Sequence, residues 1–214
     1  DLPGFSYYDT QNGFHIYKND YALPMGFTFD TYVSRSQWET YSESDRCNLL
    51  LRALVLEDDA VETYQKDMQK LPDAVHQMSD EDLLAECTER AKTACDSFTY
   101  NSKGFHATIS TDHANLVFFS VPWEEGWSAE VNSEPVSIEK ADIGFMAVPV
   151  AAGDSEITFT YHTPGLKAGA LLSLGGLILF AGYLTVAGIY NKRHPNPKTE
   201  SICCVDYSTE ETAN

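Results

Sequence analysis

The residues best suited to bind a ligand stand together in the segment VPWEEGWSAEV, residues 121–131. Here Trp123 is followed at once by two carboxylates, Glu124 and Glu125, in a short turn. An exposed indole beside carboxylates can hold a sugar, through ring stacking and through hydrogen bonds to hydroxyl groups. We therefore predict Trp123, Glu124 and Glu125 as a glycan-binding site.

Each tryptophan of this segment also has a simpler interpretation. Trp127 is in phase with Ala129 and Val131, so the alternation favours a residue of a β-sheet core. Trp123 lies outside that alternation and could instead anchor the domain at a membrane interface, where tryptophan is enriched. The sequence leaves both interpretations of Trp123 open.

No pattern in the chain predicts catalysis, a metal or a cofactor. HExxH, GxSxG, the phosphate-binding loop and the dinucleotide-binding glycine motif do not occur. His106 and His113, with Asp112, could meet across a hairpin, but a third ligand at useful spacing is missing and we expect surface turn residues. Cys87 and Cys95 fall on the apolar face of a predicted helix and are expected in the core.

The elements that must position these residues change character near residue 104. Before it, residues 1–103 predict a mixed α/β segment with helices near 45–55 and 80–95, the second starting with a capping box formed by Ser79 and Asp82. From residue 104 to 164, short runs of alternating apolar residues are separated by turn residues. This spacing predicts an antiparallel, jelly-roll-like β-sandwich, and the fold class is α+β.

An uncharged segment follows the predicted sandwich. Residues 168–190 contain no Asp, Glu, Lys, Arg or His, and as a helix they would be about 34 Å long, enough to cross a hydrocarbon core of ~30 Å. We predict a transmembrane helix, with the lipid bilayer as a partner. The tail, residues 191–214, is polar and contains two prolines, and it is predicted to be disordered.

Charge predicts the orientation in the membrane. Lys192, Arg193 and His194 follow the apolar segment, whereas Lys167 alone closely precedes it. Positive residues stay inside, so we expect residues 1–166 outside and the tail in the cytoplasm. The outer part holds 10 Lys or Arg and 28 Asp or Glu, and this acidity argues against binding to nucleic acid.

The start of the chain, DLPGFSYYDTQNGFHIYKND, has no basic and apolar export signal. A domain placed before its only predicted membrane helix needs such a signal. We expect either further membrane segments upstream or a signal peptide that has been removed.

The second half of the chain contains SVPW, GWSAEVN, PVSIEK, GFMAVPV and YHTPGLKAG, and the first half contains IYKNDYALPMGF and LLLRALVL. The first five motifs resemble the C-terminal region of the bacterial YfhO family of polytopic membrane proteins, and the last two resemble an earlier part of that region. One departure is NSEP, where the family usually has Asn-Gly. Ser133 tolerates a positive φ less well than glycine, so a tight primed turn is less expected here.

The resemblance implies a place in a GT-C-like glycosyltransferase. Such a protein would glycosylate cell-envelope polymers of the lipoteichoic acid type, with a polyprenyl-phosphate sugar as donor. Its catalytic acids would lie in outer loops of an N-terminal membrane bundle, so no catalytic residue transfers to this chain, and the bundle would be its partner. The alternative is a non-catalytic, membrane-anchored carbohydrate-binding or structural domain of the bacterial envelope.

Overall fold

The computed structural model describes residues 4–72 and 79–194 of the chain. It divides into two compact units, residues 1–164 and residues 165–214, and we describe each by itself. The predicted tail falls on residues 195–214 for the most part, outside the described residues.

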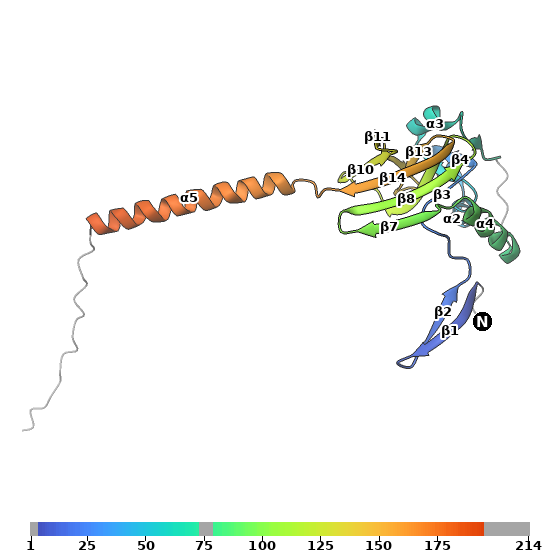
Figure 1. Cartoon of the computed structure of the whole chain (residues 1–214), viewed down its shortest axis with the longest axis horizontal. Coiled ribbons are helices and arrows are strands. Elements are labelled where there is room, and N and C mark those ends of the chain that lie inside the picture. The colour runs from blue at the N-terminus through green and yellow to red at the C-terminus, as the bar shows by residue number, and fades with distance from the viewer. Residues whose placement is uncertain (1–3, 73–78, 195–214) are drawn as a thin grey trace, which may run out of the picture. The chain divides into compact units, whose positions relative to one another are not determined.

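The first unit contains an antiparallel sheet of five strands (Figure 1). In spatial order these are β11 (Glu134–Val136), β10 (Trp127–Val131), β14 (Gly153–Tyr161), β8 (Gly104–Thr111) and β7 (Ser97–Asn101). The alternating residues of β8 behave as predicted, because Phe105, Ala107 and Ile109 are all buried.

A second sheet has seven strands and is mixed, which corrects the prediction of a purely antiparallel sandwich. Its order is β3 (Phe27–Thr28), β9 (Asn115–Pro122), β13 (Phe145–Val150), β12 (Glu139–Ala141), β5 (Leu54–Leu56), β4 (Thr31–Ser34) and β6 (Gln69–Lys70). Strand β4 runs parallel to both β5 and β6. The apolar runs are the same as expected, but alternation does not specify strand direction.

The two sheets share one hydrophobic core. Phe105 and Phe159 from the antiparallel sheet pack in the same cluster as Phe119 and Met146 from the mixed sheet. The rings of Phe105 and Phe159 are stacked with centroids 4.3 Å apart. Aromatic residues dominate this interior because each buries a large apolar area.

The other face of the mixed sheet forms a second core. The sheet curls into a half-barrel, and Phe118 on β9 packs there with Leu116 and Phe29. Helix α3 (Asp58–Tyr64) contributes Tyr64, whose hydroxyl donates a 2.9 Å hydrogen bond to Glu139. Strand β9 is therefore buried on both faces, although the sequence alternation assigned only one face to the core.

Three further helices flank the mixed sheet, α1 (Arg35–Thr40), α2 (Glu43–Leu49) and α4 (Asp80–Lys92). The helix expected near 45–55 ends at Leu49, and Leu54–Leu56 form β5 instead. A short leucine-rich run can form either a helix or a strand. Here Leu54–Leu56 form a strand because they pair with β4. The capping box of Ser79 and Asp82 at the start of α4 is confirmed.

Two hairpins have tight turns. β1 (Phe5–Gln11) and β2 (Phe14–Asn19) form a separate two-stranded sheet with exposed aromatic side chains. Between β10 and β11, Val131 pairs with Glu134, and Asn132 and Ser133 have φ of 52° and 67°. The structure therefore has a primed two-residue turn, although Ser133 made this turn less expected. Asn132 supplies one residue that tolerates a positive φ.

The second unit contains one long apolar helix, α5 (Leu166–Arg193). It is the one helix among the described residues that is long and apolar enough to cross a membrane, with a mean hydropathy of 2.0 in its most apolar window. Lys192 and Arg193 lie in its last turn. The negative end of the helix dipole stabilises positive charge there.

Candidate functional site

A cleft lies where the two sheets separate, near the last residue of β14. Its volume is about 710 Å³, within the range of small-molecule sites. Phe98, Tyr100 and Tyr161 come from the antiparallel sheet, and Val121 and Pro122 come from the mixed sheet. The other lining residues are Met25, Asn101, Ser102, Lys103, Gly104, Phe105, Glu124 and Trp127.

Two glycines allow the loops around the cleft to approach β14. A Cβ atom on Gly104 would lie 1.9 Å from the Phe159 carbonyl oxygen, and one on Gly126 would lie 2.6 Å from the His162 carbonyl oxygen. Both loops are held by backbone hydrogen bonds, from the Tyr161 N–H to Lys103 at 2.7 Å and from the His162 N–H to Gly126 at 2.8 Å. Glycine is needed where backbones come this close.

Polar and aromatic groups meet at the wall formed by Glu124, Trp127 and Tyr161. The Tyr161 hydroxyl donates a 2.8 Å hydrogen bond to Glu124 Oε2. This bond to the carboxylate raises the pKa of Tyr161, because the carboxylate stabilises the protonated phenol. The ring centroids of Trp127 and Tyr161 are 5.0 Å apart. The wall thus offers aromatic surfaces beside a carboxylate oriented by a tyrosine hydroxyl.

Only one of the three predicted glycan-binding residues lines the cleft. Glu124 lines the cleft, whereas Trp123 and Glu125 are exposed and are not among its lining residues. Trp127, predicted as a core residue, packs against Phe105 at 5.6 Å and also lines the cleft. The three predicted residues therefore do not form one wall.

Sequence reasoning missed the contribution of the hairpin between β7 and β8. Tyr100, Asn101 and Lys103 line the cleft from this hairpin. A signal was present in SFTYNSKGF, where Phe98 and Tyr100 alternate directly before a turn. Alternation identifies such a strand, but it does not identify which loops the strand end will meet.

The histidines do not combine into a metal site in the part of the chain that the structure describes. His106 Nε2 lies 2.8 Å from Glu156 on the exposed face of the antiparallel sheet. His113 Nε2 lies 4.0 Å from Asp30. Cys87 is buried and Cys95 is partly buried, as expected of core residues, and burial raises the pKa of both thiols.

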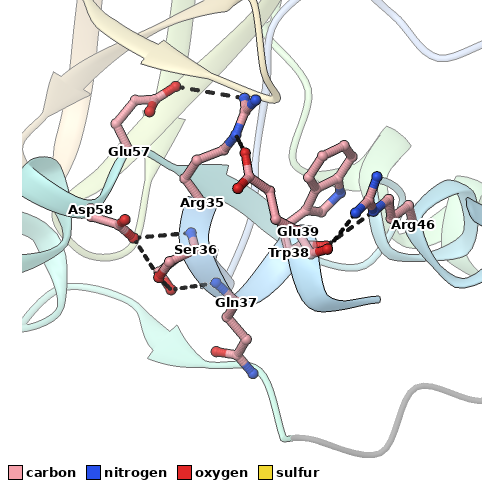
Figure 2. A network of polar contacts seen from close by, with 9 residues as sticks. Arg35, Ser36, Gln37, Trp38, Glu39, Arg46, Glu57 and Asp58 are labelled. Carbon is pink, nitrogen blue, oxygen red and sulfur yellow. Dashed lines mark hydrogen bonds and ion pairs between the residues drawn. The ribbon is translucent and has the colours of Figure 1, made fainter. Parts of the chain in front are cut away.

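A polar network around α1 links it to neighbouring helices (Figure 2). The Ser36 hydroxyl donates to Asp58 at 2.9 Å, which ties α1 to the start of α3. Trp38 lies between two guanidinium groups, with Arg46 4.5 Å and Arg35 5.4 Å from its ring centroid. These contacts connect helices α1, α2 and α3 at their ends.

Comparison with known proteins finds a family match over part of the chain. Residues 74–173 match the family described as "Bacterial membrane protein YfhO". This match covers less than half of the chain. It is 29% identical over 121 residues to a protein of Bacillus subtilis (strain 168) named "Uncharacterized protein YfhO". The aligned part is 56% of this chain but 13% of that relative. No solved structure matches the chain.

The YfhO match includes nearly all of the cleft. It extends from α4 through β7–β14 and into the first turns of α5. Met25 is the one lining residue before the matched range. Most of the cleft and the start of the apolar helix thus lie in the same matched range.

Proposed function

We propose that this chain is the extracytoplasmic module and a membrane helix of a GT-C-like glycosyltransferase of the YfhO family. The enzyme would act on cell-envelope polymers of the lipoteichoic acid type, with a polyprenyl-phosphate sugar as donor. Because the chain aligns with only 13% of its Bacillus subtilis relative, the transfer chemistry would belong to the N-terminal membrane bundle. The basic residues after the apolar part of α5 support placing residues 1–166 outside.

The module would hold the acceptor glycan in the cleft between the sheets. The observation that carries this proposal is the wall of Trp127, Tyr161 and Glu124, in which aromatic faces lie beside an oriented carboxylate. Ligand sites commonly combine mostly apolar walls with a few placed polar groups. Asn101 and Lys103, which line the cleft from the hairpin between β7 and β8, add an amide and an ammonium group.

The test is a titration of the full chain in lipid nanodiscs with a lipoteichoic-acid-type glycopolymer, followed by tryptophan fluorescence. We expect saturable binding that Glu124→Gln weakens by about tenfold or more, since a hydrogen bond to a charged group contributes about 1.5–3 kcal/mol. Glu125→Gln, in the same turn but outside the cleft lining, is the matched control. Trp123→Ala tests the contact predicted from sequence.

Two results would count against the proposal. One is the absence of saturable binding by a chain whose near-ultraviolet spectrum shows a folded domain. The other is equal affinity for the Glu124→Gln and Glu125→Gln variants. Binding by the module that has no effect on sugar transfer by the full-length protein would favour a non-catalytic carbohydrate-binding domain.

A further inference from the structure

We propose that the exposed edge of β7 pairs with the same strand of a second copy of this chain. The two β7 strands would run antiparallel about a two-fold axis at Thr99, and the two antiparallel sheets would become one continuous sheet. The proposal concerns the first unit alone, and it does not depend on whether the cleft binds a glycan.

Strand β7 has a neighbour on one side only. It pairs with β8 and stands at the end of the strand order of its sheet (Figure 1). Its other side has no strand partner in the part of the chain that the structure describes. The strand sequence SFTYN contains no charge and no proline, and four of its five residues are exposed. Such an edge is a template for pairing with another strand.

The other edges of the described sheets are shorter or have features that discourage pairing. Strands β3 and β6 have two residues each, and β11 has three, including Pro135. In the separate hairpin, β1 has a bulge between Tyr7 and Asp9, and β2 contains Lys18. Short length, proline, charge and bulges all protect an edge from a second strand. Among the described edge strands, β7 therefore lacks these protections.

The sequence of β7 is complementary to itself in the antiparallel direction. With Thr99 opposite Thr99 of the partner subunit, Phe98 lies opposite the partner's Tyr100, and Ser97 lies opposite the partner's Asn101. Opposed residues differ by an even number of positions. Backbone groups that point outward therefore meet each other, and the paired side chains stay on one face. Aromatic pairs and threonine pairs are among the cross-strand contacts that stabilise sheets.

Charges beyond the two ends of β7 favour a second copy as the partner. Asp96 precedes the strand, and Lys103 follows it after Ser102. The proposed register places Asp96 opposite Ser102 of the partner subunit, so the partner's Lys103 is one residue away. Neither Asp96 nor Lys103 forms a salt bridge within the described residues. An identical strand that runs the other way thus supplies the opposite charge at both ends.

Pairing would also cover the most exposed aromatic residue of the cleft. Tyr100 is 82% exposed and Phe98 is half-buried, and both line the cleft. In the proposed dimer the partner's Tyr100 lies beside Phe98, so each copy adds an aromatic residue to the wall of the other copy's cleft. Burial of these rings adds an apolar contribution to the backbone pairing.

The experiment measures disulfide formation by cysteine variants of the full chain in phosphatidylcholine vesicles. The background replaces one exposed cysteine and two tail cysteines with serine: Cys47, Cys203 and Cys204. Thr99→Cys should cross-link on mild oxidation, because opposed Cβ atoms lie about 4.5–5.5 Å apart. Ser97→Cys is the matched control. It should cross-link about tenfold less, since four residues, or about 14 Å, would separate the two sulfurs along the strands. A mixture of Ser97→Cys and Asn101→Cys should restore the cross-link.

Sedimentation of the full chain in detergent micelles tests the association without new cysteines. Thr99→Lys places two like charges opposite each other and should raise the dimer dissociation constant several-fold. Ser128→Lys, at an exposed position of β10 in the same sheet, should leave it unchanged. Three results would overturn the proposal. They are a Thr99→Cys cross-link no stronger than that of Ser97→Cys, a dimer that Thr99→Lys does not weaken, and a wild-type chain that stays monomeric, which would leave the edge to another partner.

Discussion

The Asp142 carboxylate accepts a 2.8 Å hydrogen bond from the backbone N–H of Val55, which lies 87 residues earlier in the chain. The N–H of Asp142 donates in return to the Val55 carbonyl at 2.9 Å. Strands β5 and β12 share one residue pair, Leu56 with Ala141. Asp142 thus extends the contact that joins the parallel part of the mixed sheet to its antiparallel part.

This contact predicts a pH dependence of stability. Burial raises the pKa of Asp142 to about 7, although the hydrogen bond from Val55 opposes that shift. Because the folded state holds the proton more tightly than the unfolded state, the free energy of unfolding should fall as pH rises from about 4 to about 7. Asp142→Asn should remove this contribution, which is on the order of 1 kcal/mol or more.

Urea unfolding of wild type and Asp142→Asn at about pH 5 and about pH 8 would measure the difference. Asparagine suits the positive φ of 44° at this position and keeps an acceptor for the Val55 N–H. The variant should gain stability relative to wild type at the higher pH. An equal response of both proteins to pH would show that Asp142 is not the titrating group.

The turn between β10 and β11 predicts a stabilising substitution. Ser133 has a φ of 67°, a region that costs a non-glycine residue about 1–2 kcal/mol. Ser133→Gly should therefore raise the free energy of unfolding by about 0.5–1 kcal/mol, after the extra freedom of glycine in the unfolded chain is subtracted. Thermal unfolding would measure the gain, and a loss of stability would contradict it. Ser133→Ala is the control, since alanine keeps the strain.

Gly126 should be sensitive to a single added methyl group. A Cβ atom there would lie 2.5 Å from the Tyr161 ring and 2.6 Å from the His162 carbonyl oxygen. We expect Gly126→Ala to cost about 1–3 kcal/mol through overpacking, and to weaken any ligand binding in the cleft. Gly144→Ala, which has open space around the new methyl group, is the matched control. Equal denaturation midpoints for the two variants would contradict this prediction.

Arg90 is buried, and its role is testable by two substitutions. Its Nη1 donates a 2.8 Å hydrogen bond to the Thr28 carbonyl, which also accepts from the Thr93 hydroxyl at 3.0 Å. Its Nε has no hydrogen-bond partner in the described structure, so the buried charge is incompletely compensated. Arg90→Met keeps the packed stem and should change stability by less than about 1 kcal/mol.

Arg90→Ala removes the stem, which packs with the guanidinium 5.1 Å from the Phe29 ring centroid. It should cost about 2 kcal/mol or more, because a cavity remains beside Phe29. Chemical denaturation of both variants would separate the two contributions. A Met variant as unstable as the Ala variant would show that the charge, rather than the stem, holds α4 against β3.

Local patterns predicted the local parts of the fold. The capping box at Ser79 and the alternation in β8 each depend on a few neighbouring residues, and both are confirmed. The mixed sheet was missed because its order depends on pairings between distant segments, such as Phe27 with Phe118. A strand as short as Leu54–Leu56 contains too few residues for its period to be read.

The candidate site was predicted only in part, because it too depends on contacts between distant segments of the chain. The turn that contains Glu124 was visible in sequence, and the structure places Glu124 in the cleft. Its partner Tyr161 lies 37 residues away, and Tyr100 arrives from the hairpin between β7 and β8. Sequence patterns identify which residues are able to bind, whereas the register between β8 and β14 decides which of them meet.

The position of β14 links the folding of the first unit to the timing of synthesis. This strand is central in its sheet, between β10 and β8, yet it comes last in chain order among the described strands of the two sheets. The sheet cannot close before residues 153–161 have left the ribosome. At about 5–20 residues per second, the residues of α5 follow within about two to six seconds. Closure of the sheet and the emergence of α5 from the ribosome thus fall within the same few seconds.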